Sequence, residues 1–261
     1  MKISCIQMDM RLADPAYNMY HAEALLRQAA REKPDVLVLP ETWNTGFFPR
    51  ENLGACCDRN GQQVKQRIGG LAREYNVNIV AGSIGNIKNG SVCNTAYVFD
   101  RQGNCIADYD KIHLFTPMQE DCYFAPGDHL CTFCLDGITC GIVICYDLRF
   151  PELTRSLALQ NIEVLFVVSQ WPAARISHLT CLSQARAIEN QIFVAVCNSC
   201  GRAGDTRYGG YSAIVNPWGV VLAQAREEET ILSAVCDMGT IRDIRSNIHV
   251  FQDRRPELYQ I

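Results

Sequence analysis

The pattern of apolar and polar positions predicts strands that alternate with helices from the start of the chain. Polar and apolar residues alternate over residues 3–8, and the runs at 35–40 and 78–83 are almost continuously apolar. Such continuous runs are typical of strands that are buried on both faces. Asp14-Pro15 marks the start of a helix that we expect to continue to about residue 32, since proline is favoured in a first helical turn. A second helix is predicted over residues 62–75.

The rest of the chain repeats this alternation and adds hairpins. Residues 92–99 and 105–109 are predicted to pair, as are residues 130–135 and 138–145, which turn at Asp136-Gly137. Helices are expected at 150–159, 175–190 and 239–246, and strands at 164–169, 193–198, 212–215, 220–223 and 231–236. Strand–helix–strand units thus alternate with hairpins twice, without a low-complexity linker. This pattern predicts an α/β protein with two mixed sheets in one domain.

Composition and charge exclude several classes of protein. The chain has 261 residues, 48% of them hydrophobic and 20% charged, which is typical of a globular protein. A net charge of -4 gives no electrostatic reason to bind nucleic acid, and the apolar runs are too short to span a bilayer. The first residues alternate rather than form the apolar region of a signal peptide. We expect most of the 14 cysteines to be buried thiols of a cytoplasmic protein.

Three residues with complementary chemistry follow the ends of predicted strands. They are Glu41, Lys111 and Cys145, each placed directly after an apolar run. In α/β sheets, ligands bind beyond the carboxyl ends of the strands. A thiolate is a nucleophile, a carboxylate can accept its proton, and an ammonium group can stabilise the oxyanion of a tetrahedral intermediate. The three residues are therefore candidates for covalent catalysis.

Two Cys-x-x-C pairs are a weaker signal for a metal. Cys131/Cys134 and Cys197/Cys200 are far apart in the chain, unlike the ligands of a compact zinc ribbon. Cys131 and Cys134 also lie in a predicted strand, where residues three apart point to opposite faces. We expect neither a metal site nor a cofactor.

Several segments resemble the signatures of the nitrilase superfamily, the carbon–nitrogen hydrolases. The first three are Pro40-Glu41, Tyr109-Asp110-Lys111-Ile112-His113-Leu114-Phe115 and residues 141–152. Residues 184–191 and Asn216-Pro217-Trp218-Gly219 match later blocks of the family, so the resemblance covers essentially residues 1–261. It implies a four-layer αββα sandwich.

The resemblance also implies roles for individual residues. Glu41 would be the general base, Lys111 the oxyanion stabiliser and Cys145 the nucleophile. Glu120 stands where many members have a second glutamate, and would fix Lys111 or the substrate amide. The backbone N–H of Tyr146 would complete the oxyanion hole.

Within the family, the chain is most similar to the omega-amidase (2-oxoglutaramate amidase) branch. The similarity lies in residues 145–153, 170–172, 184–191 and 250–259, whereas nitrilases usually have Trp-Glu after the cysteine. One departure is His178-Leu179, where relatives commonly have His-Trp. A monoamide of a 2-oxo dicarboxylic acid needs a cation for its distant carboxylate, and Arg175 is the candidate. Further candidates for contact with the substrate are Phe47, Phe115 and Trp171, which would form apolar walls.

The sequence leaves some alternatives open. A sister hydrolase of N-carbamoyl amines or amino acids, and a non-catalytic scaffold of the same fold, are the other hypotheses. Arg149 and Glu152 are expected to form a structural ion pair or to contact substrate. The expected partners are a small amide and water. The resemblance further implies at least a homodimer, with the tail of about residues 247–261 in contact with the partner.

Overall fold

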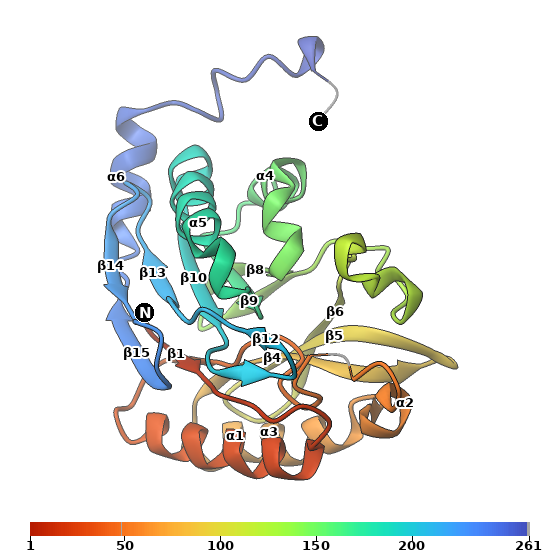
Figure 1. The fold of residues 1–261 in the computed structure, drawn as a ribbon. Helices are drawn as coiled ribbons and strands as arrows, with labels where there is room; N and C mark the ends of the chain where they lie inside the picture. Colours follow the sequence, from red (N-terminus) through yellow and green to blue (C-terminus); the bar gives the residue numbers. More distant parts are fainter. Residues whose placement is uncertain (48, 260–261) are drawn as a thin grey trace.

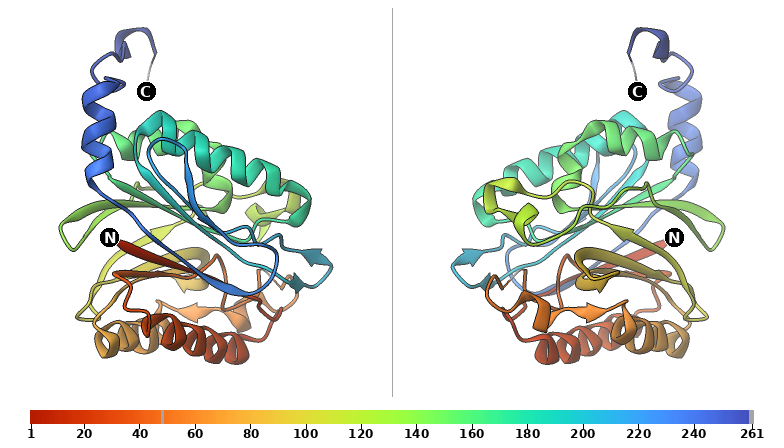
Figure 2. Two further views of the ribbon diagram at one scale, coloured as in Figure 1. Left: turned by 90° about the vertical axis from the view of Figure 1, so that its left-hand side faces the viewer. Right: turned by 90° about the vertical axis from the view of Figure 1, so that its right-hand side faces the viewer.

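The computed structural model describes residues 1–47 and 49–259 and has two β-sheets that face each other between two layers of helices (Figures 1 and 2). The first sheet has the strand order β15-β1-β2-β4-β5-β6, and β3 also pairs with β4. Its strands are β1 (Lys2–Gln7), β2 (Val36–Val38), β3 (Asp58–Arg59), β4 (Asn78–Lys88), β5 (Ser91–Phe99), β6 (Cys105–Asp110) and β15 (Thr230–Val235). The sheet is mixed, because β1, β2 and β4 run parallel while β5, β6 and β15 pair antiparallel.

The second sheet has the order β14-β13-β10-β9-β8-β7 and is also mixed. Its parallel centre is formed by β8, β9 and β10. Its strands are β7 (Thr132–Leu135), β8 (Ile138–Ile144), β9 (Val164–Ser169), β10 (Phe193–Asn198), β13 (Ala213–Val215) and β14 (Val221–Gln224). A separate small hairpin pairs β11 (Arg202–Ala203) with β12 (Thr206–Arg207).

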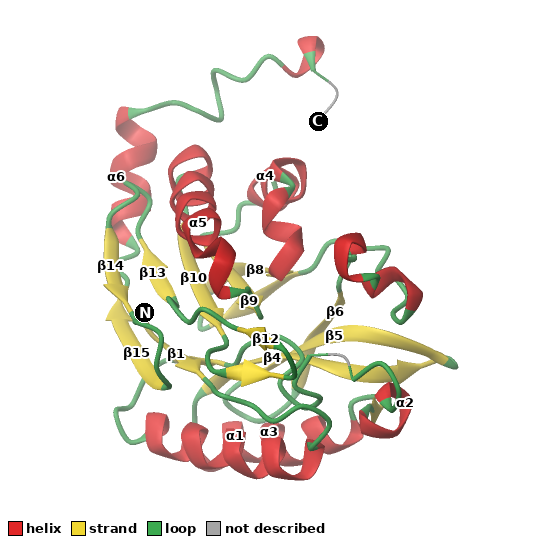
Figure 3. Cartoon of the chain, in the orientation of Figure 1, coloured by secondary structure: helices red, strands yellow, loops and turns green. Residues whose placement is uncertain are grey.

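Helices cover the outer face of each sheet (Figure 3). Helices α1 (Pro15–Ala30) and α3 (Gln62–Tyr75) lie on the first sheet, and α4 (Pro151–Ala158) and α5 (Ile176–Asn190) lie on the second. The short helix α2 is Leu53–Cys56, and α6 is Gly239–Asn247. Helix α1 begins as predicted, because the Asp14 side chain accepts a hydrogen bond from the Tyr17 N–H and Pro15 occupies the first turn. No helix in the described part of the chain is long and apolar enough to cross a membrane.

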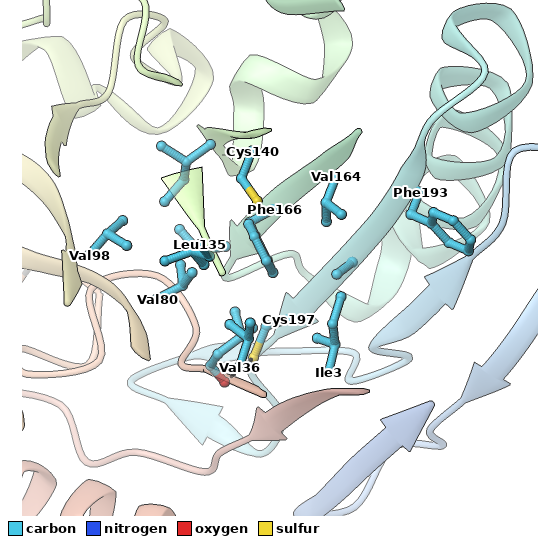
Figure 4. Packing of buried hydrophobic residues seen from close by; sticks show 14 of the residues in the cluster. Ile3, Val36, Val80, Val98, Leu135, Cys140, Val164, Phe166, Phe193 and Cys197 are labelled. Atoms are coloured by element: carbon cyan, nitrogen blue, oxygen red, sulfur yellow. Dashed lines mark hydrogen bonds between the residues drawn. The ribbon is translucent and has the colours of Figure 1, made fainter. Parts of the chain in front are cut away.

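The largest hydrophobic core lies between the two sheets. Val36, Val80 and Val98 of the first sheet face Cys140 and Phe166 of the second in this core (Figure 4). Each sheet also has a core of its own, between its outer face and the helices that cover it. The predicted α/β fold, a four-layer sandwich of two mixed sheets, is therefore confirmed.

The differences from the predicted elements are local. Strand β4 continues to Lys88, beyond the predicted end at residue 83, because it forms a long antiparallel pair with β5. Strand β2 is only Val36–Val38, shorter than its apolar run. Helix α2 and strands β3, β11 and β12 were not predicted, because elements of two to four residues carry no measurable periodicity.

Candidate active site

The structure brings the side chains of Glu41, Lys111 and Glu120 into one buried cluster. The Lys111 Nζ donates a hydrogen bond to Glu41 Oε1 at 2.9 Å and to the two oxygens of Glu120 at 2.9 and 2.8 Å. The side chains of Lys111, Glu41 and Glu120 are only 1%, 0% and 1% exposed. Cys145 lies beside them, since both Glu41 and Lys111 act electrostatically on its thiol.

Glu41 is placed by close contact between the two sheets at the end of β2. Its backbone N–H donates to the Ser169 carbonyl at the end of β9, at 3.4 Å. Gly82 makes room for this turn, because its φ is +62° and a Cβ there would lie 2.0 Å from the Pro40 carbonyl oxygen. The Glu41 carboxylate also accepts from the Asn94 Nδ2 and from the Gln170 backbone N–H, each at 2.9 Å.

Lys111 and Glu120 are held by the segment that follows β6. The Lys111 backbone N–H donates to the Asn94 carbonyl of β5 at 2.9 Å, which continues the sheet by one residue. Glu120 accepts a 2.7 Å hydrogen bond from the Phe115 N–H in addition to its bonds with Lys111. The loop between these residues therefore folds back on itself, and brings Glu120 to the ammonium group.

Cys145 occupies the sharp turn from β8 into a short 3₁₀ turn, Cys145–Arg149. Its φ of +46° is in the left-handed region, which is uncommon for residues other than glycine. Backbone strain of this kind gathers at functional sites, where the surrounding structure over-determines the conformation. The turn leaves Cys145 partly exposed and on the wall of a pocket.

The charges of the cluster set the protonation of Lys111. Burial alone would lower the pKa of Lys111, but the carboxylates of Glu41 and Glu120 outweigh it and raise this pKa well above its ordinary value. Lys111 is thus an ammonium group throughout the neutral range. Such a group can stabilise negative charge that develops next to it in a water-poor site.

The Cys145 thiol is neutral before it reacts. Burial and, after it, the Glu41 carboxylate raise the pKa of Cys145 well above its ordinary value, while Lys111 and the Gln170 backbone N–H act in the opposite direction. A neutral thiol is a poor nucleophile and needs a base that removes its proton during attack. Glu41 is hydrogen-bonded to this thiol, and a carboxylate in this position can accept its proton.

A narrow pocket opens onto Cys145 and Lys111. The predicted contact residues Phe47, Phe115, Tyr146, Trp171 and Arg175 all line it. Phe115 packs edge-on against Tyr146, with ring centroids 4.9 Å apart. The pocket is therefore mainly apolar around the thiol.

Two guanidinium groups line the same pocket. Arg175 lies over the Phe115 ring at 5.2 Å, as a cation on an apolar wall. Arg149 lies over the Trp171 ring at 4.7 Å and has its Nη2 3.2 Å from the His178 Nδ1. Within residues 1–47 and 49–259, no ion pair joins either arginine to a carboxylate.

The structure therefore corrects the expected ion pair between Arg149 and Glu152. Arg149 belongs to the 3₁₀ turn after Cys145, and its side chain runs toward the pocket, whereas Glu152 is exposed in the first turn of α4. The place of Arg149 in the pocket fits the other alternative, contact with the substrate, whereas the lining residues Met118, Gln170 and Pro172 were not predicted. The position of Arg149 four residues after Cys145 is the signal in the sequence that favours this alternative.

The Cys-x-x-C pairs lie away from this site. Cys131, directly before β7, is buried and Cys134 within β7 is exposed, so the two thiols point in opposite directions as predicted. Cys197 and Cys200 are both buried, near β1 of the opposite sheet. Among the described residues, no group of three or more His, Cys, Asp or Glu side chains is arranged to hold a metal ion.

Comparison with known proteins supports the same chemistry. Residues 2–246 match the family model of the carbon–nitrogen hydrolases. The chain is 41% identical to the 2-oxoglutaramate amidase of Bacillus subtilis, over 98% of both chains. It is 32% identical to the human omega-amidase NIT2, over 94% of this chain and 91% of the relative.

Solved structures of similar proteins share the fold. The carbon–nitrogen hydrolase superfamily protein XC1258 of Xanthomonas campestris, with an arsenic adduct in its active site, superposes with a TM-score of 0.91 at 28% identity, over 98% of this chain and 97% of that one. An amidase from Nesterenkonia sp. AN1 superposes with a TM-score of 0.87 at 27% identity, over 100% and 95%. That structure is of a Glu→Gln variant with the acetamide moiety of fluoroacetamide covalently added at the active-site cysteine. The chain belongs to the carbon–nitrogen hydrolase family and is an amidase that acts on carbon–nitrogen bonds other than peptide bonds.

Proposed function

We propose that the protein hydrolyses the terminal amide of a 2-oxo dicarboxylic acid monoamide, with 2-oxoglutaramate as the substrate, to the dicarboxylic acid and ammonia. The observation that carries the proposal is the buried Glu41–Lys111–Glu120 cluster beside Cys145 in a pocket that also presents two guanidinium groups. The cluster supplies a nucleophile, a base and a fixed cation. The guanidinium groups suit an amide that bears an anionic group at its other end. The similarity to the Bacillus subtilis 2-oxoglutaramate amidase supports this substrate.

In the first half of the reaction, the amide becomes a thioester. Glu41 accepts the proton of the Cys145 thiol as the sulfur attacks the amide carbon, and a tetrahedral intermediate forms. Lys111 stabilises the negative charge on its oxygen, together with the backbone N–H of Tyr146. The protonated Glu41 then gives the proton to the nitrogen, the carbon–nitrogen bond breaks, and ammonia leaves.

In the second half, water releases the acid. Glu41 is again a carboxylate and accepts a proton from a water molecule that attacks the thioester carbonyl. The second tetrahedral intermediate collapses, the carbon–sulfur bond breaks, and Cys145 recovers a proton from Glu41. Glu120 takes no proton in either half; its two hydrogen bonds hold the Lys111 ammonium group in place.

The distant carboxylate of the substrate would bind to Arg175, with Arg149 as a second cation. Both side chains line the pocket, and their charge is not neutralised by an ion pair in the described residues. Phe47, Phe115 and Trp171 would enclose the carbon chain between the carboxylate and the amide. Loss of a charged hydrogen bond to the substrate should lower kcat/KM by about 10–100-fold.

The decisive test is an assay of purified protein with 2-oxoglutaramate. We expect ammonia and 2-oxoglutarate in equal amounts and no carbon dioxide. Arg175→Gln and Arg149→Gln should raise KM, whereas Arg31→Gln, at the exposed end of α1, is the matched control and should not. Carbon dioxide release from an N-carbamoyl amino acid, with no turnover of 2-oxoglutaramate, would instead assign the carbamoyl activity. No turnover of either compound would overturn both substrate assignments.

We also propose that the protein is a homodimer or larger and that its tail contacts the partner. The tail is anchored at Phe251, whose ring lies 5.4 Å from the Arg155 guanidinium and 5.1 Å from that of Arg245. Beyond this anchor the chain leads away from the two sheets, and Leu258 and Tyr259 are 69% and 40% exposed (Figures 1 and 2). Deletion of residues 252–261 keeps the anchor and should shift the protein toward monomer or aggregate. Full-length protein that sediments as a monomer at micromolar concentration would contradict the proposal.

The expected cytoplasmic location belongs to the same proposal. All 14 cysteines are free thiols in the structure, and several of them are exposed. A reducing compartment preserves such thiols. Cell fractionation should find the protein with soluble cytoplasmic markers, and recovery with secreted proteins would overturn this location.

A further inference from the structure

Asp147 is a fully buried carboxylate that accepts four hydrogen bonds. Its Oδ1 accepts from the His113 backbone N–H at 2.9 Å and lies 2.8 Å from the His113 Nδ1. Its Oδ2 accepts from the Tyr109 hydroxyl at 2.8 Å and from the Ile144 backbone N–H at 3.0 Å. The side chain is 0% exposed. Because the side chain is buried, water cannot replace an oxygen of this carboxylate as the acceptor for these donors.

The four donors come from the two segments that carry the reactive side chains. Tyr109 and His113 stand two residues before and two residues after Lys111, at the end of β6 in the first sheet. Ile144 directly precedes Cys145 at the end of β8 in the second sheet. Lys111 and Cys145 thus belong to different sheets, and Asp147 is hydrogen-bonded to both segments at once.

A row of aromatic rings continues from this carboxylate to the pocket. The His113 ring stacks on Phe150, with centroids 3.6 Å apart and planes at 9°. Phe150 in turn meets Tyr146 edge-on at 5.2 Å, and Tyr146 lines the pocket. The orientation of His113 by Asp147 therefore also supports the pocket wall next to the nucleophile.

We propose that Asp147 is a positioning residue that fixes the Lys111 segment against the turn that bears Cys145. It acts through these two residues and does not touch the substrate. The inference rests on the proposed roles of Lys111 and Cys145. Asparagine cannot replace the carboxylate, because its NH₂ group would face two donors, one of which is a backbone N–H in either orientation.

The test compares Asp147→Asn and Tyr109→Phe with a matched buried aspartate. Asp58 is 6% exposed and accepts hydrogen bonds from the backbone N–H groups of Arg59, Gln63 and Val64 at the start of α3, away from the site. Asp58→Asn therefore removes a buried structural carboxylate and leaves the hydrogen bonds of Asp147 intact. Each variant is assayed for ammonia release from 2-oxoglutaramate below its unfolding temperature.

We expect Asp147→Asn to lower kcat by about 10–100-fold, because small misplacements of reacting groups have effects of this size. Tyr109→Phe should lower kcat less, and KM should stay within about threefold in both, since the substrate contacts remain. Alkylation of Cys145 by iodoacetamide at pH 9 should also slow in both, because Lys111 lowers the pKa of Cys145 and its displacement removes that effect. Asp58→Asn should change none of these quantities, whatever it does to the thermal midpoint.

The inference is overturned if folded Asp147→Asn and Tyr109→Phe keep the kcat and the Cys145 alkylation rate of the wild type. If Asp147→Asn does not fold, Tyr109→Phe decides, because it keeps the carboxylate and loses one hydroxyl. Cys145→Ala is assayed in parallel. Its full activity would refute the proposed function, whereas its inactivity beside a normal Asp147→Asn would refute this inference alone.

Discussion

Cys145, at the end of β8, and Cys197, in β10, are two thiols on segments that flank β9 in the second sheet, with very different surroundings. Both Ile144, which precedes the first, and Cys197 pair with Val168 of β9, one from each side. Burial is the largest cause that raises the pKa of each thiol well above its ordinary value. The second cause differs: it is the Glu41 carboxylate for Cys145, and a hydrogen bond with the Cys5 thiol for Cys197.

The comparison teaches that a raised pKa does not by itself distinguish a candidate nucleophile from a structural thiol. The Cys197 Sγ donates to the carbonyls of Ile6 and Val38, each at 3.2 Å, so it links the two sheets by weak hydrogen bonds. Those carbonyls cannot take its proton. Cys145 has instead a carboxylate that can take the proton and an ammonium group that can stabilise the charge of the product. Reactivity follows from these partners and not from the pKa of the free thiol.

The strongest test of the difference between the two thiols replaces each of them in turn with alanine. Cys145→Ala should abolish release of ammonia from 2-oxoglutaramate, because no other thiol is beside Glu41 and Lys111 in the described part of the chain. Cys197→Ala should retain most of the activity. Mass spectrometry of quenched wild-type reactions should find the acyl group on the peptide that contains Cys145. An acyl group on any other cysteine would contradict the assignment of Cys145 as the nucleophile.

The next test removes the partners and leaves the thiol. We expect Glu41→Gln and Lys111→Met each to lose at least about a hundredfold in kcat, since general base catalysis contributes about 10²–10⁴-fold and an oxyanion donor about 10²–10³-fold. The double variant should be little worse, because groups that act as a unit are not additive. Steady-state kinetics with 2-oxoglutaramate measures all three. Near-normal kcat in either folded single variant would make that residue a bystander.

The same two variants should differ in stability. Lys111→Met leaves the carboxylates of Glu41 and Glu120 buried without their cation, and removal of one partner from a buried pair costs about 3–5 kcal/mol. Glu41→Gln leaves Lys111 paired with Glu120 and should cost less. Thermal midpoints of the two variants, with wild type as reference, measure this difference.

Much of this contrast could be predicted from the sequence, and the reasons are physical. Glu41, Lys111 and Cys145 each follow a strand whose apolar run is visible in the chain, so their place at a strand end was predictable. A structural role for Cys197 could be predicted only in general terms, because it is one of several cysteines in predicted strands. Its contacts with Ile6 and Val38 depend on the packing of two sheets that are distant in sequence.

The residues that the sequence did not assign act at longer range. For Arg149 the sequence left open an ion pair with Glu152 or contact with the substrate, and the 3₁₀ turn after Cys145 directs its side chain to the ring of Trp171 at the pocket. Asp147 was visible only as a neighbour of Cys145, and its bonds to Tyr109 and His113 depend on the approach of β6 and β8. No pattern within one segment encodes such contacts between segments.

A smaller effect should appear in the reactivity of Cys145 toward iodoacetamide. Because the Glu41 carboxylate raises the pKa of Cys145 and Lys111 lowers it, Glu41→Gln should lower this pKa. More thiolate is then present at pH 8, so alkylation of Cys145 should be faster than in the wild type, although hydrolysis is slower. Peptide mass spectrometry also measures the alkylation of Cys197 in the same sample. Cys197 should stay unmodified until the protein unfolds. Slower alkylation in Glu41→Gln would contradict this prediction, and would mean that loss of the base outweighs the fall in the pKa of Cys145.

The smallest expected effect is on stability, and here the substitution of Cys197 should have a larger effect than that of Cys145. Cys197→Ala removes a fully buried sulfur that contacts both sheets, and should lower the free energy of unfolding by about 1–2 kcal/mol and the thermal midpoint by about 2–8 °C. Cys145→Ala should change the midpoint less, since this side chain is partly exposed to the pocket. Cys134→Ala, at an exposed position of β7, is the control and should change neither stability nor kcat. Urea unfolding of the three variants measures the differences. If Cys145→Ala proved more destabilising than Cys197→Ala, Cys145 would be a packing residue of the core, and its strained turn would need a structural explanation in place of a catalytic one.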